Sequence, residues 1–405
     1  MRLTVLFFLT LGFLAGCSDP LEDNEKCPCD VKINELQEDG TYKRSVYTFK
    51  TLENARTMTG SKINLRFNPR FYQDGSVKDI TPENQFFVNS SGILIPSHTF
   101  SEELFSIYKI MEELYYFDTQ IGVDRFLTYP RTVSIDNRSK SAKRREDAYY
   151  TPIHDRIVVL SYDGKLAPLG LNKGVIAHEH FHAIFNNVVR PIQKTVNDIG
   201  PASSSANGSE KAGMIISDTK DKNLSYNYLI LRALDEGLSD FWASLITGMS
   251  NAYLASLSKA NVEYREVSGN IYPIHSQDVL AANLVYENFK TEMKTGHGQV
   301  QGYIYFIGVH YSNLIKSLSK KIALAREDLT PDQERVEIAK WIISSLQKLA
   351  QTLEQNGSLK VLSQADLLSS FIPETQNRAL LKEICADLNE FLLQHSSKIS
   401  SCSKY

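Results

Sequence analysis

The stretch of sequence that decides the fold lies at residues 175–185 and reads VIAHEHFHAIF. It contains His-Glu-x-x-His, in which His178 and His182 stand four residues apart. Residues at this spacing share one face of a helix, so the two imidazoles can hold one ion together. Glu179 points to the side of that ion, where its carboxylate can hold a metal-bound water. The pattern therefore predicts a helix over residues 172–189 that carries a metal site.

A second predicted helix, over residues 226–247, supplies candidates for a third ligand. Glu236 and Asp240 stand four residues apart there and share a face among apolar side chains such as Leu238. An unpaired acid in such surroundings is costly, so we expect each carboxylate to have a metal or a histidine as its partner. Glu236 would complete a set of two histidines and one glutamate, which leaves a fourth position open for water. Asp240 would accept the free ring N–H of a ligand histidine.

The two motifs, at residues 178–182 and 236–240, resemble those of the gluzincin metallopeptidases of the thermolysin and fungalysin kind. The resemblance covers about residues 100–315. It implies an α+β fold of two lobes, in which the N-terminal lobe is rich in β-structure and the C-terminal lobe is mainly helical.

The resemblance also implies a zinc-dependent endopeptidase that acts on peptides or proteins. Zn²⁺ would be held by His178, His182 and Glu236, with Glu179 as the base in the attack of water on a peptide carbonyl. A further histidine would stabilise the oxyanion. The strand-like segment at residues 147–160 is similar to the edge strand along which such enzymes lay an extended substrate.

The oxyanion histidine has several candidates. His297 is the first choice, because family members place this histidine in a loop that runs into a helix after the third ligand. His275 competes for the role, since it also lies in a loop. His310 lies inside an apolar helix, which is more typical of a core histidine or of one that supports a ligand. His180 points off the ligand face of its helix, so we expect it to be structural or solvent-facing.

Two of the departures from the family pattern concern the second motif. Asp235 stands where an Asn is often found before the ligand glutamate, and it offers a rival carboxylate to Glu236. The spacing from His182 to Glu236 is 54 residues, which is longer than in the better-known members. We therefore expect residues 191–225, which are polar and contain Ser and Gly, to be an insertion that acts as a lid, a partner site or a self-cleavage loop.

The N-terminus predicts export and a lipid anchor. The apolar run at residues 3–14 is too short to span a bilayer as a mature helix, but it suits a signal peptide. It ends in LAGC at residues 14–17, which resembles the bacterial lipobox, in which the cysteine is acylated. We therefore expect a signal peptide over residues 1–16 and a protein anchored through Cys17 in the cell envelope, at the outer membrane or cell surface. An ordinary secretory signal is the alternative.

The other four cysteines fit an oxidising compartment. Cys385 and Cys402 lie close in sequence, so we expect them to form a disulfide. Cys27 and Cys29 are expected to pair with each other or to bridge to the C-terminal pair. A zinc site made from these four cysteines is the weaker alternative, because the spacing is CxC and not CxxC.

Length and charge set the remaining expectations. The chain has 405 residues, 44 Lys+Arg against 47 Asp+Glu, and a net charge of −3, so it offers no basic stripe for nucleic acid. We expect a monomer with a tether over residues 17–41 and a β-rich lobe over residues 42–170. A helical zinc-bearing lobe over residues 171–319 and a helical extension over residues 320–405 would follow.

These features favour a zinc endopeptidase tethered to a membrane by lipid. The alternative from another class is a non-catalytic envelope lipoprotein, for adhesion or scaffolding, that retains a metallopeptidase fold. Hydrolysis of a non-protein amide is a further alternative, because the zinc chemistry does not depend on what carries the carbonyl.

The lipid anchor predicts a labelling result. A radioactive fatty acid supplied to cells that produce the protein should label it, because acylation at Cys17 attaches the lipid covalently. The Cys17→Ser variant should carry no label when the two proteins are compared by autoradiography. A label that persists in this variant would refute the anchor.

Overall fold

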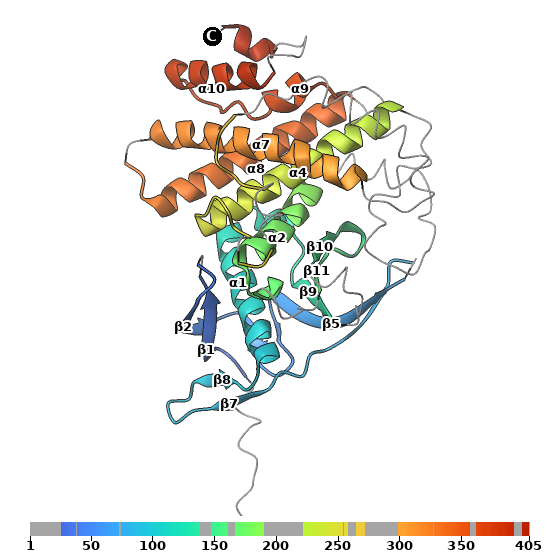
Figure 1. Ribbon diagram of the computed structural model, residues 1–405, viewed down its shortest axis with the longest axis vertical. Coiled ribbons are helices and arrows are strands. Elements are labelled where there is room, and N and C mark those ends of the chain that lie inside the picture. The colour runs from blue at the N-terminus through green and yellow to red at the C-terminus, as the bar shows by residue number, and fades with distance from the viewer. Residues whose placement is uncertain are drawn as a thin grey trace, which may run out of the picture.

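The computed structural model describes strands in the first part of the chain and mainly helices in the second (Figure 1). Two sheets and a set of helices make it an α+β protein, which confirms the predicted class. Cys17, His275 and His297 lie outside the described residues, as do the signal peptide and most of the predicted insertion. The described residues are 26–37, 39–72, 74–137, 147–160, 167–189, 222–253, 255–257, 265–271, 299–326, 328–356, 362–392 and 399–404.

The larger sheet consists of β3 Leu52–Asn54, β4 Thr59–Gly60, β5 Ile63–Phe71, β6 Val77–Ile80, β9 Arg131–Asp136, β10 Ala148–Thr151 and β11 Arg156–Leu160. Its order is β10-β11-β9-β5-β4-β3, and β6 pairs with β5. β9 runs parallel to both β5 and β11, whereas β10 pairs antiparallel with β11 and stands at the end of the order. The strand-like segment predicted at residues 147–160 is therefore a hairpin.

The smaller sheet has the order β2-β1-β8-β7, with β1 at Cys29–Leu36, β2 at Tyr42–Phe49, β7 at Phe86–Val88 and β8 at Leu94–Pro96. The predicted tether over residues 17–41 is wrong in its second half, because β1 pairs with β2 along its whole length. Val31 and Ile33 are buried, while Lys32 between them points to the other face, as the alternation of a strand requires. The alternation of apolar Val31 and Ile33 with polar Lys32 and Asn34 is present in the sequence and is the pattern of a strand.

The helices are α1 Thr99–Ile121, α2 Lys173–Val188, α4 Lys222–Thr247, α7 Gln299–Leu324, α8 Pro331–Asn356, α9 Gln364–Ser369 and α10 Arg378–Phe391. In Figure 1, α4, α7 and α8 lie together above α2, and the strands lie below around α1. α4 and α7 approach closely at two glycines, since a Cβ on Gly237 would lie 2.2 Å from the backbone oxygen of Gly308. This contact brings α7 against the helix that carries the predicted third ligand.

The predicted boundary between residues 319 and 320 is wrong, because it falls inside α7. The same helix holds α10 through Ser317, whose hydroxyl donates to Asp387 Oδ2 at 2.9 Å, and through Lys321, which pairs with Asp387 Oδ1. The C-terminal helices are therefore built onto the helical lobe and do not begin a separate unit there.

Both predicted cysteine pairs are disulfides. Cys385 bonds to Cys402, which confirms that pairing, and Cys27 bonds to Cys29 rather than to the C-terminal pair. The alternative of a zinc site made from these cysteines is wrong, since their sulfurs bond to each other. Among the described helices, none combines the length and the apolar character needed to cross a membrane.

Glu103 on α1 gives a stability prediction. It is 8% exposed and lies against Gly170, and burial raises its pKa to about 7. The unfolded chain ionises at lower pH, so the wild type loses stability as pH rises from about 4.5 to about 7 and stays lower above that range. Glu103→Gln should therefore be more stable than the wild type by up to about 3 kcal/mol at pH 8, and the difference should vanish near pH 4.

Denaturant unfolding at the two pH values measures this difference. Glu354→Gln, at an exposed position of α8, is the control and should behave like the wild type at both. Equal stability of Glu103→Gln and the wild type at pH 8 would contradict the account.

Candidate metal centre

The helix that carries His-Glu-x-x-His is buried and capped. The side-chain oxygen of Asn172 accepts hydrogen bonds from the backbone N–H groups of Gly174 and Val175, at 2.9 and 3.3 Å, and so starts α2. The predicted helix over residues 172–189 is confirmed, with observed bounds one residue shorter at each end. Apolar residues surround the motif on several sides, so its side chains lie inside the protein and not on a solvent-facing surface.

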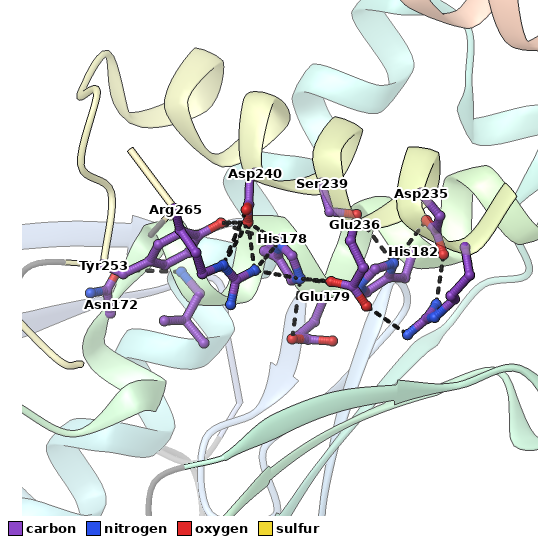
Figure 2. Close-up of polar contacts among 12 residues, drawn as sticks. Asn172, His178, Glu179, His182, Asp235, Glu236, Ser239, Asp240, Tyr253 and Arg265 are labelled. Carbon is purple, nitrogen blue, oxygen red and sulfur yellow. Dashed lines mark hydrogen bonds and ion pairs between the residues drawn. The ribbon is translucent and has the colours of Figure 1, made fainter. Parts of the chain in front are cut away.

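α4 packs against α2 and presents four buried polar side chains to it. Glu236 and Asp240 are each 3% exposed, and Asp235 and Ser239 are buried beside them. Figure 2 shows these side chains pointing from α4 toward the histidines of α2. The predicted pairing of the two motifs in space is therefore what the structure describes.

Three donor atoms converge between the two helices. His178 Nε2 and His182 Nε2 lie 3.0 Å apart, and Glu236 Oε2 lies 3.3 Å from the former and 3.6 Å from the latter. Among the described residues, Glu236 Oε2 is buried without a hydrogen-bond partner. Glu179 Oε1 lies slightly farther away, 3.9 Å from His178 Nε2. His178, Glu179 and His182 form a group that could hold a metal ion.

The far side of the His178 ring faces Asp240, as predicted. Asp240 Oδ1 lies 3.0 Å from His178 Nδ1 and accepts a hydrogen bond from the Tyr253 hydroxyl at 2.7 Å. Arg265 donates to both Asp240 oxygens, and its guanidinium lies over the Tyr253 ring at 4.7 Å (Figure 2). The guanidinium also lies 5.0 Å from the Tyr305 ring, and its Nη2 is 3.2 Å from each ring nitrogen of His178. A carboxylate in this position holds the ring proton on Nδ1, which leaves Nε2 with its lone pair.

The far side of the His182 ring faces Asp235. Asp235 Oδ1 lies 2.8 Å from His182 Nδ1, and the Ser239 hydroxyl lies 3.1 Å from the same atom. The sequence left Asp235 open as an alternative to Glu236 as a ligand. In the structure Asp235 approaches Nδ1 of His182, whereas Glu236 approaches Nε2 of the same ring. Each histidine therefore has a carboxylate at Nδ1, and the two Nε2 atoms face each other with Glu236.

The charges around these atoms favour a cation. Burial disfavours the imidazolium of His182, but Asp235 and Glu236 outweigh it and raise its pKa to about 10. Burial would also raise the pKa of Glu236, yet Arg232 and the histidines hold it well below its usual range. The same negative charge that attracts a proton to this place also attracts a metal cation, and a metal must displace that proton to bind.

Glu179 differs from the other carboxylates of the site. Burial raises its pKa, the nearby Glu236 adds to this effect, and the two histidines and Arg265 oppose it. A carboxylate whose pKa is raised is a stronger proton acceptor than one at its usual value.

Of the other candidate histidines named from the sequence, His180 and His310 are described. His180 is buried with its Nε2 2.9 Å from Asp118 Oδ2, which also accepts from the Tyr129 hydroxyl, so it is structural and not solvent-facing. His310 lies on α7 with its ring edge-to-face against Phe306, at 5.1 Å between centroids. The oxyanion role of His297 or His275 stays a prediction.

Sequence reasoning missed three contributors to the site. Tyr253 and Arg265 come after α4, in segments without a recognisable pattern, so only the folded chain brings them to Asp240. Arg232 did carry a signal, because it precedes Asp235 by three residues and Glu236 by four on one helix.

The geometry predicts that replacing Glu236 and replacing Asp235 will lower zinc affinity by different amounts. Glu236→Ala removes a donor atom and should nearly abolish zinc binding, whereas Asp235→Asn should lower zinc affinity by about 10–100-fold, because it acts through His182. Competition with a coloured chelator measures both affinities. Asp332→Asn, at an exposed position on α8, is the control. Zinc affinity that survives Glu236→Ala and disappears in Asp235→Asn would show that Asp235 is the ligand.

Comparison with known proteins adds nothing to this geometry. No protein-family model matches the chain, and no curated protein is significantly similar to it.

Proposed function

We propose that the protein is a zinc-dependent endopeptidase. The observation that carries the proposal is the convergence of His178 Nε2, His182 Nε2 and Glu236 Oε2, separated by 3.0, 3.3 and 3.6 Å. Donors placed tetrahedrally at about 2.0–2.1 Å from zinc lie about 3.4 Å from one another. The three separations bracket this value, and two histidines with one glutamate form a donor set of catalytic zinc sites.

The buried oxygen of Glu236 supports the same assignment. Within the described part of the chain Oε2 has no hydrogen-bond partner, and an unpaired buried carboxylate oxygen is costly. A cation shared with the two imidazoles would satisfy it. His178, His182 and Glu236 would then hold Zn²⁺, which, when bound, lowers the pKa of water toward neutrality and polarises a carbonyl.

Glu179 would move the proton in this reaction. Its carboxylate lies beside the donor atoms, 3.9 Å from His178 Nε2, and is buried with a raised pKa. It would accept a proton from the attacking water at one carboxylate oxygen and return it to the nitrogen of the departing amine. Retention of this base in the site favours a catalytic protein over a non-catalytic scaffold.

The larger sheet suggests how an extended peptide would bind. β10 stands at the end of the strand order and packs against α2, the helix of the metal site. Among the described residues β10 pairs on one side only, with β11. A peptide that adds to such an edge gains backbone hydrogen bonds regardless of its sequence, which suits a protease better than an enzyme for a small amide.

The proposal also includes a thermolysin-like arrangement of two lobes and a location in the cell envelope. Strands with α1 on one side of α2 and the other helices on the other side suit a thermolysin-like arrangement of two lobes. The two disulfides suit an oxidising compartment, as export and a lipid anchor at Cys17 would require. We propose that the enzyme acts in the cell envelope on peptides or proteins.

Replacing the base tests the mechanism. Glu179→Gln should lower the rate of cleavage of an internally quenched peptide library by at least about 10²–10⁴-fold, because the amide cannot accept the proton. Zinc content should remain near one equivalent per chain. Glu390→Gln, at an exposed position on α10, should keep full activity. Cleavage at the wild-type rate in Glu179→Gln, or a wild type that takes up no zinc on reconstitution, would overturn the proposal.

A further inference from the structure

One arginine holds two buried carboxylates of the candidate metal centre at once. Arg232 lies one turn before Glu236 on α4. Its Nη1 donates to Asp235 Oδ2 at 2.7 Å, and its Nη2 lies 2.8 Å from Glu236 Oε1. The side chain of Arg232 is one-third exposed, whereas both carboxylates are 4% exposed, so the guanidinium closes the outer side of the pair.

The two contacts of the Arg232 guanidinium determine which oxygen of each carboxylate faces the histidines. Asp235 directs Oδ1 to His182 Nδ1 while Oδ2 is held by Arg232. Glu236 directs Oε2 to the two Nε2 atoms while Oε1 is held by the same guanidinium. Rotation of either carboxylate about its last C–C bond would break one of these two contacts.

We infer that Arg232 is a positioning residue that makes Glu236 a ligand through one oxygen only and orients His182 through Asp235. The inference rests on the proposed metal centre. A carboxylate with both oxygens free can bind a cation through both of them, as many calcium ligands do. With Oε1 held in a charge-assisted hydrogen bond, Glu236 offers Oε2 alone, which preserves the open position that a catalytic site needs.

The second arginine of the site has a different role. Arg265 donates to Asp240, lies over two tyrosine rings and approaches the His178 ring, with Nη2 3.2 Å from each ring nitrogen. None of the described contacts joins Arg265 to Glu236 or Asp235. Among the described contacts, Arg232 is the arginine that reaches the carboxylate proposed as a ligand. The inference therefore concerns Arg232 specifically and not positive charge near the site in general.

The test compares metal binding by the full-length protein with that of Arg232→Gln, Arg232→Lys and Arg326→Gln. Arg326 is the matched control, since it is an exposed arginine that pairs with one carboxylate, Glu337, away from the site. Zinc affinity is measured by chelator competition, and the coordination number is read from the visible absorption of the cobalt(II)-substituted protein. Neither readout requires a substrate.

We expect Arg232→Gln to lower zinc affinity by about 10–100-fold. It should also weaken the cobalt(II) absorption, because a released Glu236 can bind through both oxygens and raise the coordination number. Arg232→Lys keeps the charge but has no planar fork, so it should recover part of the affinity and keep the weakened absorption. Arg326→Gln should match the wild type in both measurements.

Wild-type affinity and absorption in Arg232→Gln would overturn the inference. If Arg232→Gln does not fold, wild-type absorption in Arg232→Lys would overturn it as well, since charge alone would then suffice. A wild type that binds zinc but cleaves no peptide would refute the proposed peptidase and leave this inference standing. A wild type that binds no metal would overturn both.

Discussion

Nε2 of His178, Nε2 of His182 and Oε2 of Glu236 lie within 3.6 Å of one another in the buried contact between α2 and α4. Bringing two imidazole nitrogens and a carboxylate oxygen together away from water costs free energy unless they share a cation, which can be a proton or a metal ion. The surrounding side chains keep this arrangement, because Asp240 and Asp235 hold the protons of the two rings on the opposite nitrogens. The contact between the two helices therefore gathers side chains that could hold a cation.

The rest of the helical lobe fixes α4 against α2. A glycine pair, Gly237 and Gly308, lets α7 approach α4 at backbone distance. Arg232 and Arg265 then neutralise the buried carboxylates from two sides, with Arg265 enclosed by aromatic rings. On the other side of α2, β10 brings a sheet edge toward the same helix. In the proposed peptidase these contacts would hold the ligands in place, and the adjacent strand would bind an extended chain.

Periodicity predicted the parts of this structure that depend on local sequence. The His-Glu-x-x-His helix, its partner helix and the Cys385–Cys402 disulfide follow from spacing alone. Other features depend on tertiary contacts. Asp235 could be separated from Glu236 only by seeing which ring nitrogen each approaches. No spacing rule indicated that Arg265 would reach Asp240 from a later segment.

Two histidines and one glutamate are proposed to share a single zinc ion. X-ray absorption at the zinc edge of the purified full-length protein tests it most directly, because it reports the donor type and the metal–donor distances together. The account predicts one zinc per chain with nitrogen and oxygen donors at about 2.0–2.1 Å, the scattering of two imidazoles, and no sulfur. Sulfur donors at about 2.3 Å, or a spectrum without imidazole scattering, would contradict it.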